Sequence, residues 1–239
     1  LEREGVDCSA ARRFQGRRSA LSAVVIDARG ERMIVNHTDP DLSRDPDWIA
    51  AAMPSDVSAV LADISWPEGA HAALIEARRR GAPGILDADH PIPSARDVFK
   101  AASHLAFSAQ GMRAFAGRDD LATAVRDAAR ETGAWCCVTD GARGVLVASP
   151  GSDAVSQVSG FDVDAVDTLG AGDVWHGAFA LRLAETRDES DAVRFANAAA
   201  AIKVTRPGGR RGAPNRAETD AFLETRSAGD TFTFQSRSA

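Results

Sequence analysis

The most informative segment of this 239-residue chain is Val166-Asp167-Thr168-Leu169-Gly170-Ala171-Gly172-Asp173, directly before and within a predicted helix over 170–185. Gly-Ala-Gly at a helix start lets the backbone approach a ligand closely. The N–H groups without partners and the positive helix end favour an anion there. Asp173 places a carboxylate beside this anion site, and a natural role for it is general base for a hydroxyl that attacks phosphorus. A Gly-rich N-cap with a capping Asp is the alternative, and these residues alone leave both open.

Predicted strands and helices alternate on both sides of this segment. The strands are 57–63, 83–87, 104–107, 134–139 and 144–148, and the helices are 67–80, 94–102, 119–132, 170–185, 190–205 and 215–224. Such alternation is typical of parallel βαβ units and predicts a layered α/β fold with a mostly parallel sheet. Two β-rich runs, 21–27 and 31–36, lie outside the alternation and predict a small hairpin through Ala28-Arg29-Gly30.

Composition excludes several classes of protein. The net charge of −6 and the pI near 5.4 give no basic field for nucleic acid. No apolar run is long enough to predict a membrane span. Three cysteines without a CxxC motif predict neither a disulfide framework nor a zinc site, and they favour a reducing, cytoplasmic location. Cys136 and Cys137 are expected on opposite faces of one strand, as small core residues.

Lysine is rare in the chain. Only Lys100 and Lys203 are present among 28 basic residues, and we interpret this as a bias of genome composition rather than a functional signal.

With DTLGAGD at 167–173, the chain resembles the ribokinase-like (phosphofructokinase B-type) carbohydrate kinases from about Gly5 to about Leu223. Three further stretches carry the resemblance: VTDGARG at 138–144, FANAAAA at 195–201, and the Gly-rich loop from Thr205 to Pro214. The resemblance implies a three-layer αβα fold with a mostly parallel central sheet. It also implies a division of the chain into a kinase core (1–20 and 37–226), a β lid (21–36) and a flexible tail (227–239).

The same resemblance implies ATP-dependent phosphorylation of a hydroxyl on a small sugar, a ketose or ketose derivative. Gly170, Ala171 and Gly172 would form the anion hole for the transferred phosphoryl group, and Asp173 would contact the sugar hydroxyl as catalytic base. The lid would also join two copies into a homodimer. A nucleoside kinase of the same fold, and a non-catalytic member that binds nucleotide or sugar, remain alternatives.

Ligand-binding residues follow from the resemblance by position. They are Thr139, Gly141 and Gly144 at the ATP phosphates, Asn197 beside adenine, Gly208 in the closing loop, Asn36 at the sugar, and Asp167 at a monovalent cation, K⁺. Asp167 would share that cation with loop carbonyls around Arg206 and Gly208. Mg²⁺ is expected together with ATP.

The chain also departs from the family. Ser108-Ala109-Gln110-Gly111 replaces the usual Asn-x-x-Glu, so Mg²⁺ must be held otherwise, and Gly212 stands where many members have a Ser near the cation. About the first 70 residues of a typical member are absent. The chain begins at Leu1 without Met, which predicts a processed or truncated start or an N-terminal part outside this chain.

Within the family, the stretches at 30–42, 60–66 and 204–209 look closest to the bacterial sulfofructose kinase branch. Ser65 replaces an Arg of that branch, which argues for a neutral sugar, because a sulfonate favours a cation.

Five other residues near the ends of predicted elements receive more modest interpretations. His176 is interpreted as a satisfied helix histidine, Trp175 and Phe179 as core, and Asp87 and Asp89 as weak active-site candidates at the carboxyl end of a strand.

Overall fold

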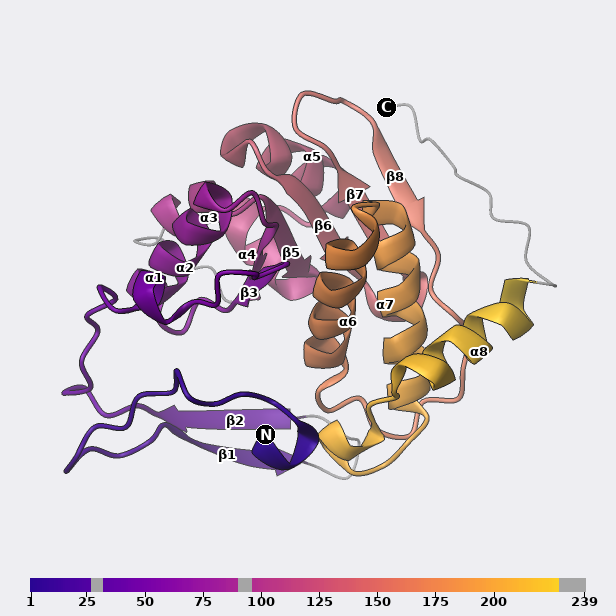
Figure 1. The fold of residues 1–239 in the computed structure, drawn as a ribbon. Helices are drawn as coiled ribbons and strands as arrows, with labels where there is room; N and C mark the ends of the chain where they lie inside the picture. Colours follow the sequence, from indigo (N-terminus) through magenta and orange to yellow (C-terminus); the bar gives the residue numbers. More distant parts are fainter. Residues whose placement is uncertain (27–31, 90–95, 228–239) are drawn as a thin grey trace. The chain divides into compact units, whose positions relative to one another are not determined.

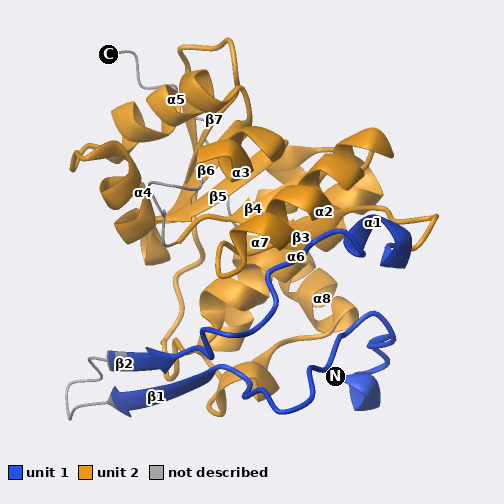
Figure 2. Cartoon of the chain, turned by 90° about the vertical axis from the view of Figure 1, so that its left-hand side faces the viewer, with its two compact units in different colours: residues 1–53 blue, residues 54–239 orange. Residues whose placement is uncertain are grey.

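The protein is described here by a computed structural model, which covers residues 1–26, 32–89 and 96–227. The chain divides into two compact units, Leu1–Met53 and Pro54–Ala239 (Figure 2). The larger unit contains a six-stranded sheet, and the smaller unit contains a separate two-stranded sheet. No helix in the described ranges is long and apolar enough to cross a membrane.

The six-stranded sheet has its strands in chain order. They are β3 (Val60–Ala62), β4 (Gly84–Asp87), β5 (His104–Ser108), β6 (Trp135–Thr139), β7 (Val145–Ala148) and β8 (Val155–Val158). The pairs from β3 to β6 are parallel, whereas β7 and β8 are added antiparallel. This confirms the predicted mostly parallel sheet. Strand β8 was not predicted, because VSQV is short and lacks an apolar run.

Helices cover both faces of this sheet. One apolar core joins α2 (Pro67–Arg79), α3 (Arg96–Ala101), α4 (Ala109–Ala116) and α5 (Leu121–Thr132) to one face. A second core joins α6 (Ala171–Thr186) and α7 (Glu189–Val204), which lie side by side over the other face (Figure 1). Helix α8 (Arg216–Ser227) follows, and its Arg216 guanidinium lies 5.0 Å from the Phe195 ring of α7. The three layers are therefore those that the sequence indicated.

Alternation along the strands divides the side chains between the two cores. Cys136 is buried in the core under α5, and Cys137 is buried in the core under α6, as predicted for adjacent strand residues. Both cysteines are free thiols, and burial raises the pKa of Cys136 to about 12. They are therefore packing residues with little thiolate character.

Helix α4 was not predicted, although its start is well defined. The Ser108 hydroxyl caps it by accepting the N–H of Gly111 at 3.0 Å, and Gly117 ends it in the left-handed conformation. The eight-residue helix is too short for its periodicity to stand out in the sequence.

The smaller unit contains the predicted hairpin. Strands β1 (Leu21–Ile26) and β2 (Arg32–His37) pair antiparallel from Leu21 opposite His37 to Ile26 opposite Arg32. The predicted link Ala28-Arg29-Gly30 lies outside the described residues, as do residues 228–239 of the predicted tail.

The boundary of this unit differs from the predicted one. Residues 1–20 and 37–53, which include a 3₁₀ turn (Glu2–Glu4) and α1 (Ile49–Ala52), group with the hairpin rather than with the kinase core. Their contacts explain the grouping, because Arg17 pairs with Asp41 at 2.7 Å and the guanidinium of Arg12 lies 4.3 Å from the Trp48 ring.

Helix α6 is held on the sheet by three stacked aromatic rings. Phe179 is fully buried between Trp135 of β6, with ring centroids 5.5 Å apart, and Trp175, with centroids 5.1 Å apart. The planes are tilted by 15° and 8°, respectively, so both contacts are stacked. The stack fixes the first half of α6 relative to Trp135, the first residue of β6.

We expect Phe179→Ala to lower the free energy of unfolding by about 3–5 kcal/mol, because it removes a fully buried ring and leaves a cavity. Urea unfolding followed by tryptophan fluorescence measures the change. Leu181→Ala on the same helix is the matched control, since Leu181 is 49% exposed. Equal losses for both variants would contradict the anchoring role of the stack.

Candidate functional site

A cavity of about 300 Å³ lies at the carboxyl end of β6, where α6 begins. Six residues that the sequence assigned to nucleotide or phosphate binding line it: Thr139, Gly141, Gly144, Ala171, Gly172 and Asn197. The rest of the lining is mostly apolar and includes Phe161, Val163 and Trp175. An apolar cavity with a few polar groups is typical of a small-molecule site.

Asn197 holds the walls of this cavity together. Its Oδ1 accepts the indole N–H of Trp175 at 2.8 Å, and its Nδ2 donates to the Ser159 carbonyl at 3.0 Å. The side-chain amide has two N–H groups, and the second is available for a ligand. Asn197 is therefore first a positioning residue, and Trp175 is a core residue, as predicted, that also forms cavity wall.

The start of α6 presents backbone donors beside the cavity. Gly170 is the N-cap residue with φ 77°, and the helix ladder begins with the Val174 N–H donating to the Gly170 carbonyl at 3.0 Å. The Ala171 N–H donates to the Thr168 carbonyl at 3.2 Å, so it is engaged within the turn. The N–H groups of Gly172 and Asp173 lie in the first turn, where an α-helix supplies no acceptor of its own. Asp173 is exposed beside them.

The half-buried Asp87 and the buried His176 form a pair close to Asp173. The Nδ1 of His176 lies 3.2 Å from the Asp87 carboxylate, and neither ring nitrogen has an aligned hydrogen-bond partner among the described residues. Burial raises the pKa of Asp87, and the charges of Asp89 and Asp173 act in the same direction, against the attraction of His176. His176 is thus not a satisfied helix histidine, because both of its ring nitrogens are buried without an aligned partner among the described residues.

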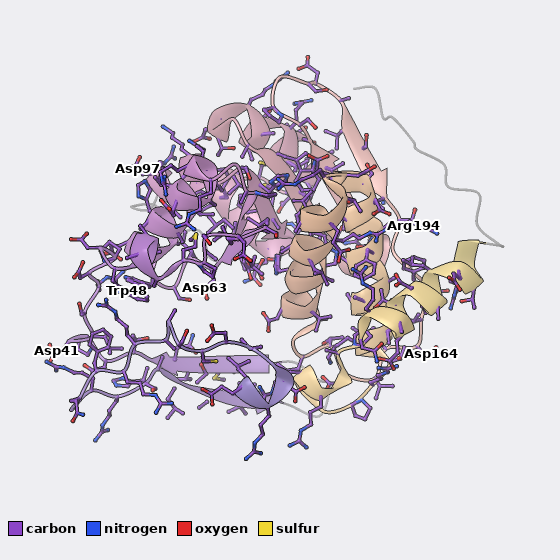
Figure 3. All side chains as sticks on the ribbon, in the orientation of Figure 1. Asp41, Trp48, Asp63, Asp97, Asp164 and Arg194 are labelled. Atoms are coloured by element: carbon purple, nitrogen blue, oxygen red, sulfur yellow. The ribbon has the colours of Figure 1, made fainter. Side chains whose placement is uncertain are left out.

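Asp89 and Asp63 have local structural partners. Asp89 accepts the Ser108 N–H at 2.7 Å and so links the end of β4 to the start of α4. Asp63, labelled in Figure 3, directly follows β3 and accepts the Ser65 N–H at 2.8 Å.

The lost Asn-x-x-Glu motif has a steric explanation. A Cβ at Gly111 would lie 2.8 Å from the Asp89 carbonyl oxygen and 2.9 Å from that of Ala88. These distances are too short for any side chain, so a glutamate does not fit at 111 in this backbone. The end of β4 occupies the place where its side chain would begin.

Asp167 and Gly208 lie together outside the cavity lining. Asp167 Oδ2 accepts the N–H groups of Gly208 at 3.0 Å and Gly209 at 2.9 Å, and Oδ1 accepts that of Leu169 at 2.9 Å. These bonds, led by Gly209 and Leu169, lower the pKa of Asp167 to about 2. Gly208 therefore tethers the closing loop rather than lining the cavity. Within the described chain, no cluster of three or more His, Cys, Asp or Glu residues could hold a metal ion.

The structural role of Lys203 was not predicted from the sequence. Its Nζ donates to the Asp167 carbonyl at 2.5 Å and lies 3.5 Å from Oδ1 of the same residue. Its position inside the apolar pattern of α7 was the available signal.

Asn36 lies in the smaller unit, in the hairpin opposite Ser22, with an exposed side chain. Its predicted contact with the sugar stays a prediction.

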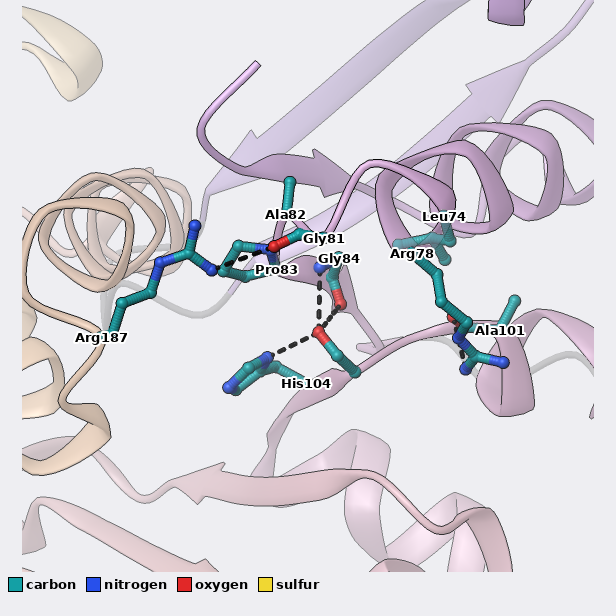
Figure 4. Close-up of a pocket in the computed structure, with 10 residues that line it drawn as sticks. Leu74, Arg78, Gly81, Ala82, Pro83, Gly84, Ala101, His104 and Arg187 are labelled. Atoms are coloured by element: carbon teal, nitrogen blue, oxygen red, sulfur yellow. Dashed lines mark hydrogen bonds between the residues drawn. The ribbon is translucent and has the colours of Figure 1, made fainter. Parts of the chain in front are cut away.

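A second cavity, of about 290 Å³, lies where β4 begins, and several of its polar groups form structural hydrogen bonds (Figure 4). Arg78 donates to the carbonyls of Lys100 and Ala101, and the Ser103 hydroxyl bonds both backbone groups of Gly84. Because open α/β sheets bind ligands at the carboxyl ends of their strands, the cavity at β6 is the candidate site.

Comparisons with known proteins identify the family of the chain. A profile of the pfkB family of carbohydrate kinases matches residues 1–216. Ribokinase of Haemophilus influenzae is 44% identical over 87 residues, which are 36% of this chain and 28% of that protein. ATP-dependent ribose-1-phosphate kinase of Halopiger xanaduensis is 28% identical over 231 residues, 95% of this chain and 75% of that protein. The chain thus spans well under two thirds of the Haemophilus relative that it matches.

Solved structures show the same fold. A protein from Agrobacterium tumefaciens, provisionally described as a ribokinase, is 36% identical with a TM-score of 0.79, and the match covers 90% of this chain and 71% of that one. A double mutant of fructokinase from Vibrio cholerae, with fructose, ADP and potassium ion bound, is 24% identical with a TM-score of 0.71, covering 93% and 78%.

Proposed function

The chain belongs to the pfkB family of carbohydrate kinases, and we propose that it transfers the γ-phosphoryl group of ATP to a hydroxyl of a small sugar. The observation that carries the proposal is the placement of Asp173. Its exposed carboxylate stands in the first turn of α6, next to Ala171 and Gly172, which line the cavity.

The proposed reaction uses the two sides of this helix start. The sugar hydroxyl loses its proton to Asp173 while its oxygen attacks the γ-phosphorus, and the bond from that phosphorus to the β–γ bridging oxygen breaks to leave ADP. The first-turn N–H groups and the positive end of α6 stabilise the charge on the phosphoryl oxygens. Thr139, Gly141 and Gly144 would border the ATP phosphates, and the apolar wall with Asn197 would receive the adenine.

Mg²⁺ neutralises charge on the ATP phosphates in such transfers. Asp87 and Asp89 are the residues of this chain that would hold the Mg²⁺ ion. The half-buried Asp87 carboxyl has a raised pKa, and the repulsion from Asp89 and Asp173 that contributes to it would be relieved by a divalent cation. We assign these two carboxylates to the water shell of the metal, in place of the missing Asn-x-x-Glu.

Asp173→Asn should lower kcat by about 10²–10⁴-fold, the range for loss of a general base. The KM for ATP should change only a few-fold, because the carboxylate acts on the transition state rather than on nucleotide binding. Initial rates of ADP formation with saturating sugar measure both constants. Asp164→Asn, an exposed carboxylate nearby in sequence, is the control. A variant that keeps more than about a tenth of the wild-type kcat would rule out Asp173 as the base.

For the substrate, we propose a neutral ketose or a close analogue of one. Asn36 offers neutral hydrogen bonds for sugar hydroxyls. The fructose bound by the Vibrio cholerae fructokinase is a ketose, which supports this class. The sulfofructose kinase branch rests only on short stretches of resemblance. Ser65, at the position of its Arg, donates its N–H to the Asp63 carboxylate, and that negative charge disfavours a sulfonate nearby.

We therefore expect kcat/KM for fructose to match or exceed that for sulfofructose under one salt condition. Ribose, fructose 6-phosphate and inosine complete the panel, and Asp173→Asn measures the background with each compound. A preference for sulfofructose above about 100-fold, or nearly 3 kcal/mol, would contradict the neutral-sugar proposal. A preference for inosine of the same size would favour a nucleoside kinase instead.

We also propose that the hairpin joins two copies of the chain. Directly paired residues share a face of a sheet, so Leu21, Val25, Met33 and Val35 lie on one face, and their exposed fractions are 71%, 58%, 64% and 60%. An isolated two-stranded sheet is marginally stable in water. An exposed apolar face of this kind is expected to be covered by a partner surface.

The wild-type chain should then be a dimer at micromolar concentration, and Val35→Glu should convert it to a monomer by burying a charge in the interface. Light scattering after size-exclusion chromatography measures the mass. Ser22→Glu on the other face of the hairpin is the matched control and should leave the dimer intact. A monomeric wild-type chain would refute the proposal.

A further inference from the structure

Lys203 is an unusually placed cation. Its side chain is fully buried at the end of α7, and it contacts both the carbonyl and the carboxylate of Asp167. A buried ammonium is costly unless it is paired and hydrogen-bonded. The pairing with Asp167 is therefore what makes a lysine tolerable at this position.

The contacts of Asp167 leave little room for an additional cation. Both carboxylate oxygens already accept backbone N–H groups, and the carbonyl oxygen accepts the ammonium at 2.5 Å. A monovalent metal ion at these oxygens would lie within a few ångströms of the Lys203 charge and would be repelled by it. The residues present thus do not fit the monovalent cation that the family resemblance assigns to Asp167.

Gly212 points in the same direction. The resemblance expects a serine near the cation at this position, but a Cβ there would lie 3.0 Å from both the Cβ and the carbonyl oxygen of Arg206. A side chain at this position would therefore require Arg206 to shift by a few tenths of an ångström, so the loop favours glycine.

The ammonium lies where it can set the position of the phosphoryl-binding turn. The N–H groups of Val166 and Asp167 donate to the Val204 carbonyl at 2.7 and 3.0 Å, next to Lys203 in sequence. Asp167 in turn holds Leu169, directly before Gly170. The end of α7 and the start of α6 are thus joined through Lys203 and Asp167.

We propose that the ammonium of Lys203 replaces the monovalent cation in this chain, so that its phosphoryl transfer needs no K⁺. The inference rests on the kinase function proposed above. Lys203 is a positioning residue here: it neutralises Asp167 and fixes the turn, and it does not contact the reacting atoms.

The first experiment uses the wild-type chain and compares KCl, NH₄Cl and tetramethylammonium chloride at equal ionic strength. Turnover should agree within about twofold, because equal ionic strength keeps general screening the same in the three salts. Thermal unfolding should also give the same Tm in the three salts, since no salt supplies a ligand for the folded state. Activation by K⁺ of about tenfold or more, the size of a typical coupling between sites, would overturn the proposal.

The second experiment removes the ammonium with Lys203→Met, which keeps a long apolar stem. We expect turnover in tetramethylammonium to fall about tenfold or more and to recover in K⁺ or NH₄⁺, within the range of coupled binding. The Tm of this variant should now rise with KCl. Lys100→Met, which removes the only other lysine and lies exposed on α3, should behave as wild type. A variant that folds and responds to no cation in either measurement would contradict the replacement.

The two readouts separate the two proposals. If no sugar is phosphorylated, the kinase function fails while the Tm comparison still tests the cation. If Lys203→Met does not fold, Lys203→Gln, which keeps a hydrogen-bond donor, takes its place and the wild-type salt comparison still decides.

Discussion

The carboxylate of Asp167 is the constraint on which the site depends. It joins the loop at Gly208 and Gly209, the turn at Leu169 and the end of α7 through Lys203. The turn at Leu169 and the loop at Gly208 have no long ladder of backbone bonds to define their positions, whereas the end of α7 is helical. Three backbone donors that converge on one ionised side chain supply that definition, and charge-assisted bonds of this kind are stronger than neutral ones.

The cavity and the apolar core share a wall. Trp175 packs its ring on Phe179 and donates its indole N–H to Asn197, and it also lines the cavity. Substitutions in the aromatic stack are therefore coupled to the shape of the nucleotide side of the site. Because Asn197 also bonds the Ser159 carbonyl, the segment after β8 is tied to α7 by a side-chain hydrogen bond.

The sequence was sufficient for the layered fold because the signals for it are local. Apolar runs at 83–87 and 134–139 and the helical spacing at 119–132 each predict an element within a few residues of its observed bounds. The short elements β8 and α4 were missed, since four to eight residues carry too little periodicity. Long-range partners were missed for another reason: the pairs His176–Asp87 and Lys203–Asp167 join residues far apart in the chain, and each residue by itself has an ordinary interpretation. The missing Asn-x-x-Glu was visible in the sequence, but its cause, the approach of the β4 end to Gly111, needed coordinates.

The scarcity of lysine has a practical consequence for chemical labelling. Lys100 is exposed and Lys203 is fully buried. All other residues among the 28 lysines and arginines are arginines, which acylating reagents leave untouched. An amine-directed dye or resin would therefore modify one side chain of the folded molecule, that of Lys100. Lys100 lies on α3, which covers the opposite face of the sheet from α6. Modification at the second lysine would mark molecules that have opened around α7, which gives the protein a built-in reporter of local unfolding.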